Sequence, residues 1–471
     1  MSARAPASEC TWHYRAALFA AAVITLSCAR ANSQAAAERS FGNPSADAVE
    51  PCAPAPDTRT PLSLSQAIDL ALCNNPDVAV AWANIRAQAA ALGEARSAYW
   101  PNLSVSASEL NERTGYPGTG VPAGNTTAKT IYGSLDWRLF DFGVRASRYR
   151  AAESLLTAAI ATRDATIQQV LGTVIQAYFD AITANAVVTD RTESESVARK
   201  TLDSARRRLA GGDAAQNDVL QATAALERAR LDHNRAEADD EKAVAVLAYS
   251  LGLPAGSTIL LADSVNARSS IQESDLTAWL HATERRHPAI LAARAAVQAA
   301  REDVASARSA DRPTIDLTAN YYENGFPNQG LTSTNLRAAT VGITVTVPLF
   351  DGFLTHYNVE QAKATVEVRE GQLRQVRQAT LMAVVQAYAD SHSALGNVNM
   401  SEDLLTAAQA ALESSQRRYL QGAADIVELL SAQEALADAR MELTRSLADW
   451  RADRLRLLAS AGMLERTDIA N

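Results

Sequence analysis

The sequence contains few of the residues that ordinary mixed folds use in quantity. Its 471 residues include only 21 Gly, 15 Pro and 6% aromatics, whereas Ala is abundant. With so few helix breakers and bulky residues, the composition indicates a helix-rich chain. Basic charge is also scarce, because the net charge is −9 at pH 7. No nucleic-acid partner is expected, since that function needs a basic surface to displace phosphate counterions.

Patterns for catalysis and metal binding are missing as well. The six histidines show no metal-ligand spacing, and His281 and His287 would occupy different faces of a helix. The sequence has no P-loop, no GxSxG elbow and no GxGxxG fingerprint. It therefore predicts no enzyme, no catalytic residue, no metal site and no cofactor.

A helical membrane span is also not expected, because a span needs roughly 18 or more apolar residues. The apolar run at 16–27 is shorter, follows Arg4 and Arg15, and precedes the small residues Ala29 and Ala31. These features predict a signal peptide over 1–31. An acylated start at Cys28 is disfavoured, because Thr25 occupies the position where a lipobox has Leu.

Cysteine is rare, with four in the whole chain. Cleavage after Ala31 would leave Cys52, in a flexible Pro/Ala-rich tail over 32–61, and Cys73. In an oxidising compartment this pair could form a disulfide. The alternative is that the two thiols never meet, and the sequence leaves both possibilities open.

What the sequence does contain is a tandem duplication. The stretches "LFDFG" at 139 and "LFDGF" at 349 stand 210 residues apart. Residues 75–108 line up with 287–320, and 207–230 line up with 417–440. Such a long period exceeds a solenoid repeat, so each half is an assembly of its own. The predicted organisation is a first repeat (62–252), a connecting segment (253–274), a second repeat (275–462) and a C-terminal tail (463–471).

Each repeat combines helices with two predicted strands. Pro76 and Pro288 suit the first turn of a helix, and Pro101 and Pro313 end those helices. Four runs then alternate between apolar and polar residues with the period of a strand. Their apolar positions are Leu103, Val105 and Ala107; Ile131, Gly133, Leu135, Trp137 and Leu139; Ile315, Leu317, Ala319 and Tyr321; and Val341, Ile343, Val345, Val347 and Leu349.

Long stretches without proline follow the strands, at 142–211 and 353–421. A Gly-containing turn then predicts a returning helix in each half. In the second half an apolar residue recurs every seven positions, which is typical of coiled coils. These positions are Leu429, Leu436, Leu443, Trp450 and Leu457.

Four strands with one apolar face cannot stand alone in a bilayer, because their edges would leave backbone groups unpaired. Single-chain bacterial barrels have at least about eight strands, so this sheet would have to close with other copies. Two other interpretations are an ordinary sheet packed on helices and a coiled-coil scaffold. The signal peptide and the alternating strands favour the membrane barrel over both.

These residues together resemble the TolC-like outer-membrane efflux proteins. The resemblance rests on the duplication, on "VPLFDGF" (347–353), on the paired long helices and on the hairpin "RRYLQGAADIVELLSAQEALADAR", and it covers about 62–462. It implies a mainly α fold with a small β part, closing as a homotrimer. Three chains would form a 12-stranded barrel among outer-membrane lipids and a helical tunnel in the periplasm. The implied partners are a periplasmic adaptor and an inner-membrane ABC exporter or proton-driven pump.

The resemblance also implies a gate at the two helix turns. In the family, a tyrosine and an arginine of one hairpin bond to a threonine-aspartate pair of the other, and two carboxylates constrict the pore. Tyr419, Asp218 and Glu428 match the tyrosine, the aspartate and the first carboxylate. Ala424, Asn217 and Ser431 stand in place of the arginine, the threonine and the second carboxylate. The resemblance therefore implies a gate with fewer links; without it, all three matches would be solvated helix-end residues.

The cargo of such a duct is open between two classes. A type I secretion duct passes an unfolded protein, whereas the duct of a tripartite pump passes drugs or metals. The opening "CAPAPD" and "PLSLSQAIDLALCNNP" resembles the outer-membrane components that export adenylate cyclase-haemolysin toxins. We therefore expect type I secretion of an RTX-like toxin, with the drug or metal pump as the alternative.

Overall fold

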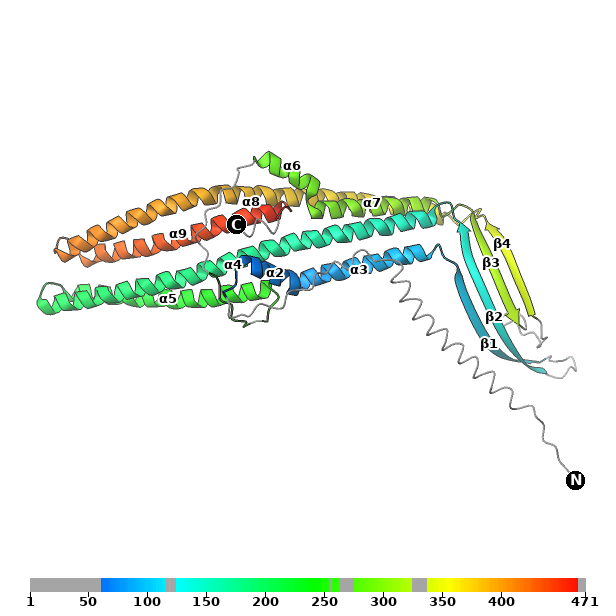
Figure 1. The fold of residues 1–471 in the computed structure, drawn as a ribbon, viewed down its shortest axis with the longest axis horizontal. Helices are drawn as coiled ribbons and strands as arrows, with labels where there is room; N and C mark the ends of the chain where they lie inside the picture. The colour runs from blue at the N-terminus through cyan, green and yellow to red at the C-terminus, as the bar shows by residue number, and fades with distance from the viewer. Residues whose placement is uncertain are drawn as a thin grey trace, which may run out of the picture. The chain divides into compact units, whose positions relative to one another are not determined.

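The computed structural model describes residues 61–115, 118, 124–254, 256–262, 275–323 and 337–464 (Figure 1). The same order of elements occurs twice: two helices, two strands, a long helix and a returning helix. The first set comprises α2 (Leu64–Asn74), α3 (Pro76–Ser97), β1 (Asn102–Thr114), β2 (Gly124–Phe140), α4 (Val144–Gly211) and α5 (Gln216–Ser250). The second comprises α6 (Leu276–Arg286), α7 (Pro288–Arg308), β3 (Thr314–Glu323), β4 (Arg337–Thr346), α8 (Leu354–Leu420) and α9 (Ile426–Ser460). The duplication is confirmed element by element.

Several predicted segments fall outside the described residues. These are the signal peptide (1–31), nearly all of the tail 32–61, and most of the segments 253–274 and 463–471. Both repeats belong to one compact unit, 53–471. Within it, α4 of the first repeat packs along α7 and α9 of the second. The repeats are therefore halves of one folded unit, and not separate domains.

The first helices of each repeat begin where the sequence predicts. Pro76 and Pro288 each occupy the first turn, where a missing N–H has no partner to lose. The residue before each proline caps the helix: the Asn75 side chain accepts from the Asp77 N–H at 2.9 Å, and His287 Nδ1 accepts from the Ala289 N–H at 3.2 Å. The two repeats therefore start this helix with the same backbone design and different cap residues.

The strands form one antiparallel sheet in the order β1-β2-β3-β4. Its register brings the predicted apolar positions into common rows, for example Leu103 opposite Leu135, Leu135 opposite Ala319, and Ala319 opposite Val341. The predicted apolar positions therefore share one face of the sheet, and the predicted faces are confirmed. Farther along β1 and β2 the same face becomes polar, where Glu109 lies opposite Lys129. β1 and β4 are the two edges of the sheet.

The fourth strand is shorter than predicted. The alternation suggested that it continues to Leu349, but β4 ends at Thr346. Pro348 explains the difference, because proline has no N–H for the ladder and restricts Val347 before it. β2 does reach Phe140, with a register shift between Arg138 and Phe140. The strand-to-helix passages of the two repeats are therefore built differently.

The long helices contain 68 residues in α4 and 67 in α8, and each reverses at a turn into a returning helix of 35 residues. Gly212 (φ 84°) and Gly422 (φ 73°) make these turns in the left-handed region that favours glycine. Leu429, Leu436, Trp450 and Leu457 of the heptad pattern are buried. Leu443 is half-buried. The coiled-coil prediction therefore holds for the returning helix of the second repeat.

The expectation of no apolar span after the signal peptide needs one correction. Among the described helices, α4 contains an 18-residue window apolar enough to cross a bilayer by composition alone. Half of that window is buried within the chain. Val174, Ile175 and Tyr178 of α4 pack there with Leu247 and Leu251 beside the end of α5. The apolar residues of α4 are thus accounted for by packing between helices.

Candidate functional site: the strand–helix junctions and the helix tips

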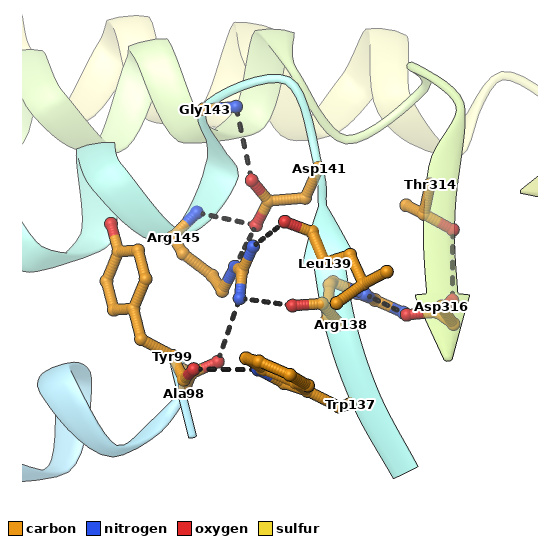
Figure 2. Close-up of polar contacts among 10 residues, drawn as sticks. All are labelled: Ala98, Tyr99, Trp137, Arg138, Leu139, Asp141, Gly143, Arg145, Thr314 and Asp316. Carbon is orange, nitrogen blue, oxygen red and sulfur yellow. Dashed lines mark hydrogen bonds and ion pairs between the residues drawn. The ribbon is translucent and has the colours of Figure 1, made fainter. Parts of the chain in front are cut away.

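The passage from β2 into α4 is organised around a buried ion pair (Figure 2). Asp141, only 6% exposed, ends the "LFD" motif. Its carboxylate accepts from the backbone N–H groups of Gly143 (3.2 Å) and Arg145 (3.0 Å), and from Arg145 Nε at 2.9 Å. A carboxylate at this place satisfies N–H groups that the first turn of a helix leaves free.

The Arg145 guanidinium then connects three elements. Nη1 donates to the carbonyl oxygens of Arg138 (2.7 Å) and Ala98 (3.2 Å), and Nη2 donates to that of Leu139 (3.2 Å). The same group lies 4.8 Å from the centre of the Tyr99 ring. Because its donors are fixed in a plane, one arginine holds the end of α3, the end of β2 and the start of α4 together.

The second repeat lacks this arrangement. Asp351 matches Asp141 and accepts from the Thr355 N–H at 2.8 Å. Hydrogen bonds from the Thr355 side chain and backbone lower the pKa of the Asp351 carboxyl. Thr355 occupies the position of Arg145 and has no guanidinium to reach the strand. Accordingly, Leu349 is 93% and Phe350 is 77% exposed in the single chain.

At the far end, the two helical hairpins lie against each other. Links between α4 and α9 recur along their length, including Glu193 to Arg440 Nη1 at 2.8 Å and Thr201 Oγ1 to Gln433 Nε2 at 2.9 Å. Nearer the turns, the hairpins share an apolar cluster. It consists of Ala198, Leu202, Ala205, Ala222, Leu226, Tyr419, Ile426 and Leu429.

Tyr419 lies in this cluster and is only 4% exposed. Its hydroxyl is buried without a hydrogen-bond partner among the described residues. The carboxylate of Asp218 instead caps α5, where its Oδ2 accepts from the Ala215 N–H at 3.3 Å. Within one chain, the structure therefore does not join Tyr419 to Asp218.

The other predicted gate and pore residues lie around the turns. Asn217 and Ser431 are exposed, and Ala424 is half-buried. Glu428 is held within its own hairpin, because its Oε1 accepts from Arg418 Nη1 at 2.7 Å and from Ser415 Oγ at 3.3 Å. The predicted constriction carboxylate is therefore paired with a cation in the single chain.

Sequence reasoning missed two arginines at the turns. Arg208 and Arg418 stand 210 residues apart, so the duplication aligns them. Each donates through Nη2 to a carbonyl of its own turn, Asp213 O and Ala423 O, at 3.3 Å in both cases. The repeat offset, applied to charged as well as apolar residues, would have found this pair.

Cys73 is disulfide-bonded, and the other three cysteines lie outside the described residues. No group of three or more His, Cys, Asp or Glu side chains suited to a metal ion occurs in the part of the chain that the structure describes. The pairing of Cys73 with Cys52 stays a prediction.

Comparison with known proteins places this architecture in a family. The model of the outer membrane efflux protein family matches residues 67–253 and 279–463. CyaE of Bordetella pertussis is 38% identical over 441 residues, which are 93% of this chain and 92% of that protein. The alkaline protease secretion protein AprF of Pseudomonas aeruginosa is 25% identical, over 71% of this chain and 70% of that protein. The crystal structure of the Campylobacter jejuni CmeC outer membrane channel superposes with a TM-score of 0.75 at 19% identity, covering 86% of each chain. The chain is therefore a member of the outer membrane efflux protein family, whose fold and outer-membrane location it shares.

Proposed function

We propose that this protein is the outer-membrane exit duct of a type I secretion system for a protein of the RTX toxin or haemolysin kind. The main observation in favour of a duct is the sheet, which has an apolar face and two edges, β1 and β4, that pair with no other strand among the described residues. In a bilayer such edges must be satisfied by closure. The type I branch draws support from the similarity to AprF, which is named for alkaline protease secretion. Family membership also argues against the coiled-coil scaffold.

Closure requires a homotrimer in this proposal. Three copies of the four-stranded sheet give 12 strands, and the paired helices of three chains would surround a tunnel in the periplasm. Purified in mild detergent, the protein should have an apparent mass of about three chains. A monomer that stays soluble without detergent would reject the proposal.

Its partners would be a periplasmic adaptor and an inner-membrane ABC exporter. The second candidate is the duct of a tripartite drug or metal pump, driven by a proton-coupled transporter. Deleting the gene separates the two: loss of a large protein from the culture medium with unchanged drug and metal tolerance supports type I secretion. Unchanged secretion with lowered tolerance supports the pump.

The gate of the duct would lie at the helix tips. In the closed trimer, the Tyr419 hydroxyl would bond to Asp218 of a neighbouring hairpin, with Asn217 and Ala424 contributing no further strong link. The support is the unpaired hydroxyl of Tyr419, since a buried donor without a partner is unfavourable by about 1–3 kcal/mol. Glu428 and Ser431 would line the constriction. Tyr419→Phe should raise single-channel conductance in planar bilayers; unchanged conductance in normally assembled trimers would place the gate elsewhere.

The disulfide partner of Cys73 would be Cys52. Cys10 and Cys28 precede the predicted cleavage site, so Cys52 is the one cysteine besides Cys73 that the predicted mature sequence keeps. Mass spectrometry of a non-reduced digest should find the two peptides linked, and recovery of both as free thiols would exclude the bond.

A further inference from the structure

Arg208 lies in the last turn of α4, at the end of the series of links between the two hairpins. Its Nη1 donates to the main-chain oxygen of Tyr419 on α8 at 2.8 Å. The guanidinium carbon also lies 4.5 Å from the centre of the Tyr419 ring. The other terminal nitrogen, Nη2, donates to Asp213 O in the turn of its own hairpin. One side chain therefore contacts the ends of both hairpins.

The contacts from Arg208 to Tyr419 combine charge, hydrogen bonding and ring stacking in one side chain. The acceptor belongs to the last turn of α8, at the negative end of the helix dipole, and the same carbonyl also accepts from the Gly422 N–H of the turn at 3.1 Å. A guanidinium supplies charge, two donors in fixed directions and a face that stacks on an aromatic ring. Because the Tyr419 hydroxyl is unpaired, the polar contacts that hold this residue are made to its backbone and to its ring face.

The repeat-related residue shows that the crossing is specific to Arg208. Arg418 makes the equivalent bond to its own turn, at Ala423 O. Its Nη1, however, reaches Glu428 of the same hairpin at 2.7 Å. Of two aligned arginines, the first joins the hairpins and the second stays within one.

We propose that Arg208 fastens the tip of the first-repeat hairpin to the tip of the second-repeat hairpin in each chain, beyond the links between α4 and α9, and that releasing it opens the periplasmic end of the duct. Arg208 thus acts as a positioning residue for Tyr419, and its own contacts keep the tips together. This inference rests on the proposed function as a duct with a gate at the helix tips.

The test compares Arg208→Gln with Arg208→Lys and with the control Arg207→Gln. Arg207 is the exposed neighbour of Arg208 on α4, so its substitution removes the same charge from the same region. Purified trimers of each variant are placed in planar bilayers for single-channel conductance. Cells carrying each variant are assayed for sensitivity to vancomycin, which is too large for a closed duct.

Arg208→Gln removes the charge-assisted hydrogen bond to the Tyr419 carbonyl. If this bond is present only in the closed state, its loss should shift the closed-to-open ratio by about 10-fold or more. Arg208→Gln should therefore raise conductance and sensitise the cells, Arg208→Lys should do so less, and Arg207→Gln should match the wild type. A role in folding alone would instead lower the amount of trimer and leave the conductance of assembled trimers unchanged, which would overturn the inference. If the wild-type trimer forms no channel, the duct itself is rejected, and the gating role falls with it.

Discussion

The two repeats share a backbone plan and differ in how polar side chains secure it. At the strand–helix junction, Arg145 of the first repeat donates to three carbonyls, whereas Thr355 of the second donates to Asp351, four residues before it, and to no strand carbonyl among the described residues. At the tips, Arg208 crosses to the other hairpin and Arg418 does not. The first repeat therefore holds more of the internal polar links at both ends of the long helices.

The difference shows which features a duplication preserves. Glycines in the turns, prolines at helix starts and strand alternation fix the backbone, and they recur in both repeats. Polar links depend on single side chains, so each copy can lose or redirect them without changing the fold. In the proposed trimer, the exposed second junction, with Leu349 and Phe350, would face lipid or a neighbouring chain. In that trimer, the junction with fewer internal links would gain contacts on assembly.

The largest expected difference between the two junctions should appear when Arg145 is removed. Arg145→Ala leaves the buried Asp141 carboxylate without its cation and frees three carbonyls, so it should destabilise the protein by about 3–5 kcal/mol. Thr355→Ala should lower stability by roughly 1 kcal/mol or less, because the backbone bond to Asp351 remains. The measurement is the thermal midpoint of trimer dissociation. Equal losses for the two variants would mean that the junctions are equivalent after all.

A second prediction concerns the sheet, where we expect the two repeats to behave alike. Leu135 and Val345 lie 210 residues apart on the apolar face, and Ser134 and Thr344 precede them on the other face. Arginine at Leu135 or Val345 would face lipid and should cost about 2–4 kcal/mol per chain near the bilayer centre. Arginine at Thr344, which is exposed, should cost much less. The yield of assembled trimer measures the effect, and equal loss on both faces would reject the assigned orientation.

The sequence predicted the backbone of this molecule far better than its contacts. Period-two alternation, paired prolines and the 210-residue offset suffice for the strands, helix starts and turns, because each depends on local chemistry. The end of β4 was wrong by a few residues, since alternation was followed past Pro348. Arg145 and Arg208 were not foreseen as links, because their acceptors are main-chain carbonyls that any sequence would offer. The role of Glu428 at the constriction stays a prediction, and its bond to Arg418 depends on a side-chain direction that spacing does not specify.

The pairing of Arg418 with Glu428 gives a third prediction, on ion selectivity. Arg418→Gln removes the cation beside Glu428, so a free carboxylate would appear near the constriction in each chain. At partly screened distances such a charge contributes on the order of 1 kcal/mol to attracting a cation. The reversal potential in a salt gradient should therefore shift towards cation preference, and Glu428→Gln combined with Arg418→Gln should cancel the shift. An unchanged reversal potential in Arg418→Gln would place Glu428 away from the pore.

The smallest expected difference between the repeats concerns the helix caps at Asn75 and His287. His287 can accept from the Ala289 N–H only while its Nδ1 is unprotonated, whereas the Asn75 cap does not titrate. Burial lowers the pKa of His287, so the unfolded chain binds a proton more readily than the folded one. The stability from this group is complete above the ordinary histidine pKa near 6.5 and is lost as the pH falls through the lower folded value.

Acidification should therefore weaken the start of α7 and leave the start of α3 unchanged. His287→Asn, which installs the first-repeat cap, should remove this part of the pH dependence while preserving stability at pH 7. A helix cap contributes about 0.5–2 kcal/mol, which bounds the effect. Hydrogen exchange at the α7 amides between pH 7 and 5, corrected for the intrinsic rate, measures it directly, with the α3 amides as an internal control. Equal protection of the two helices across that range would show that His287 keeps its cap when acidified.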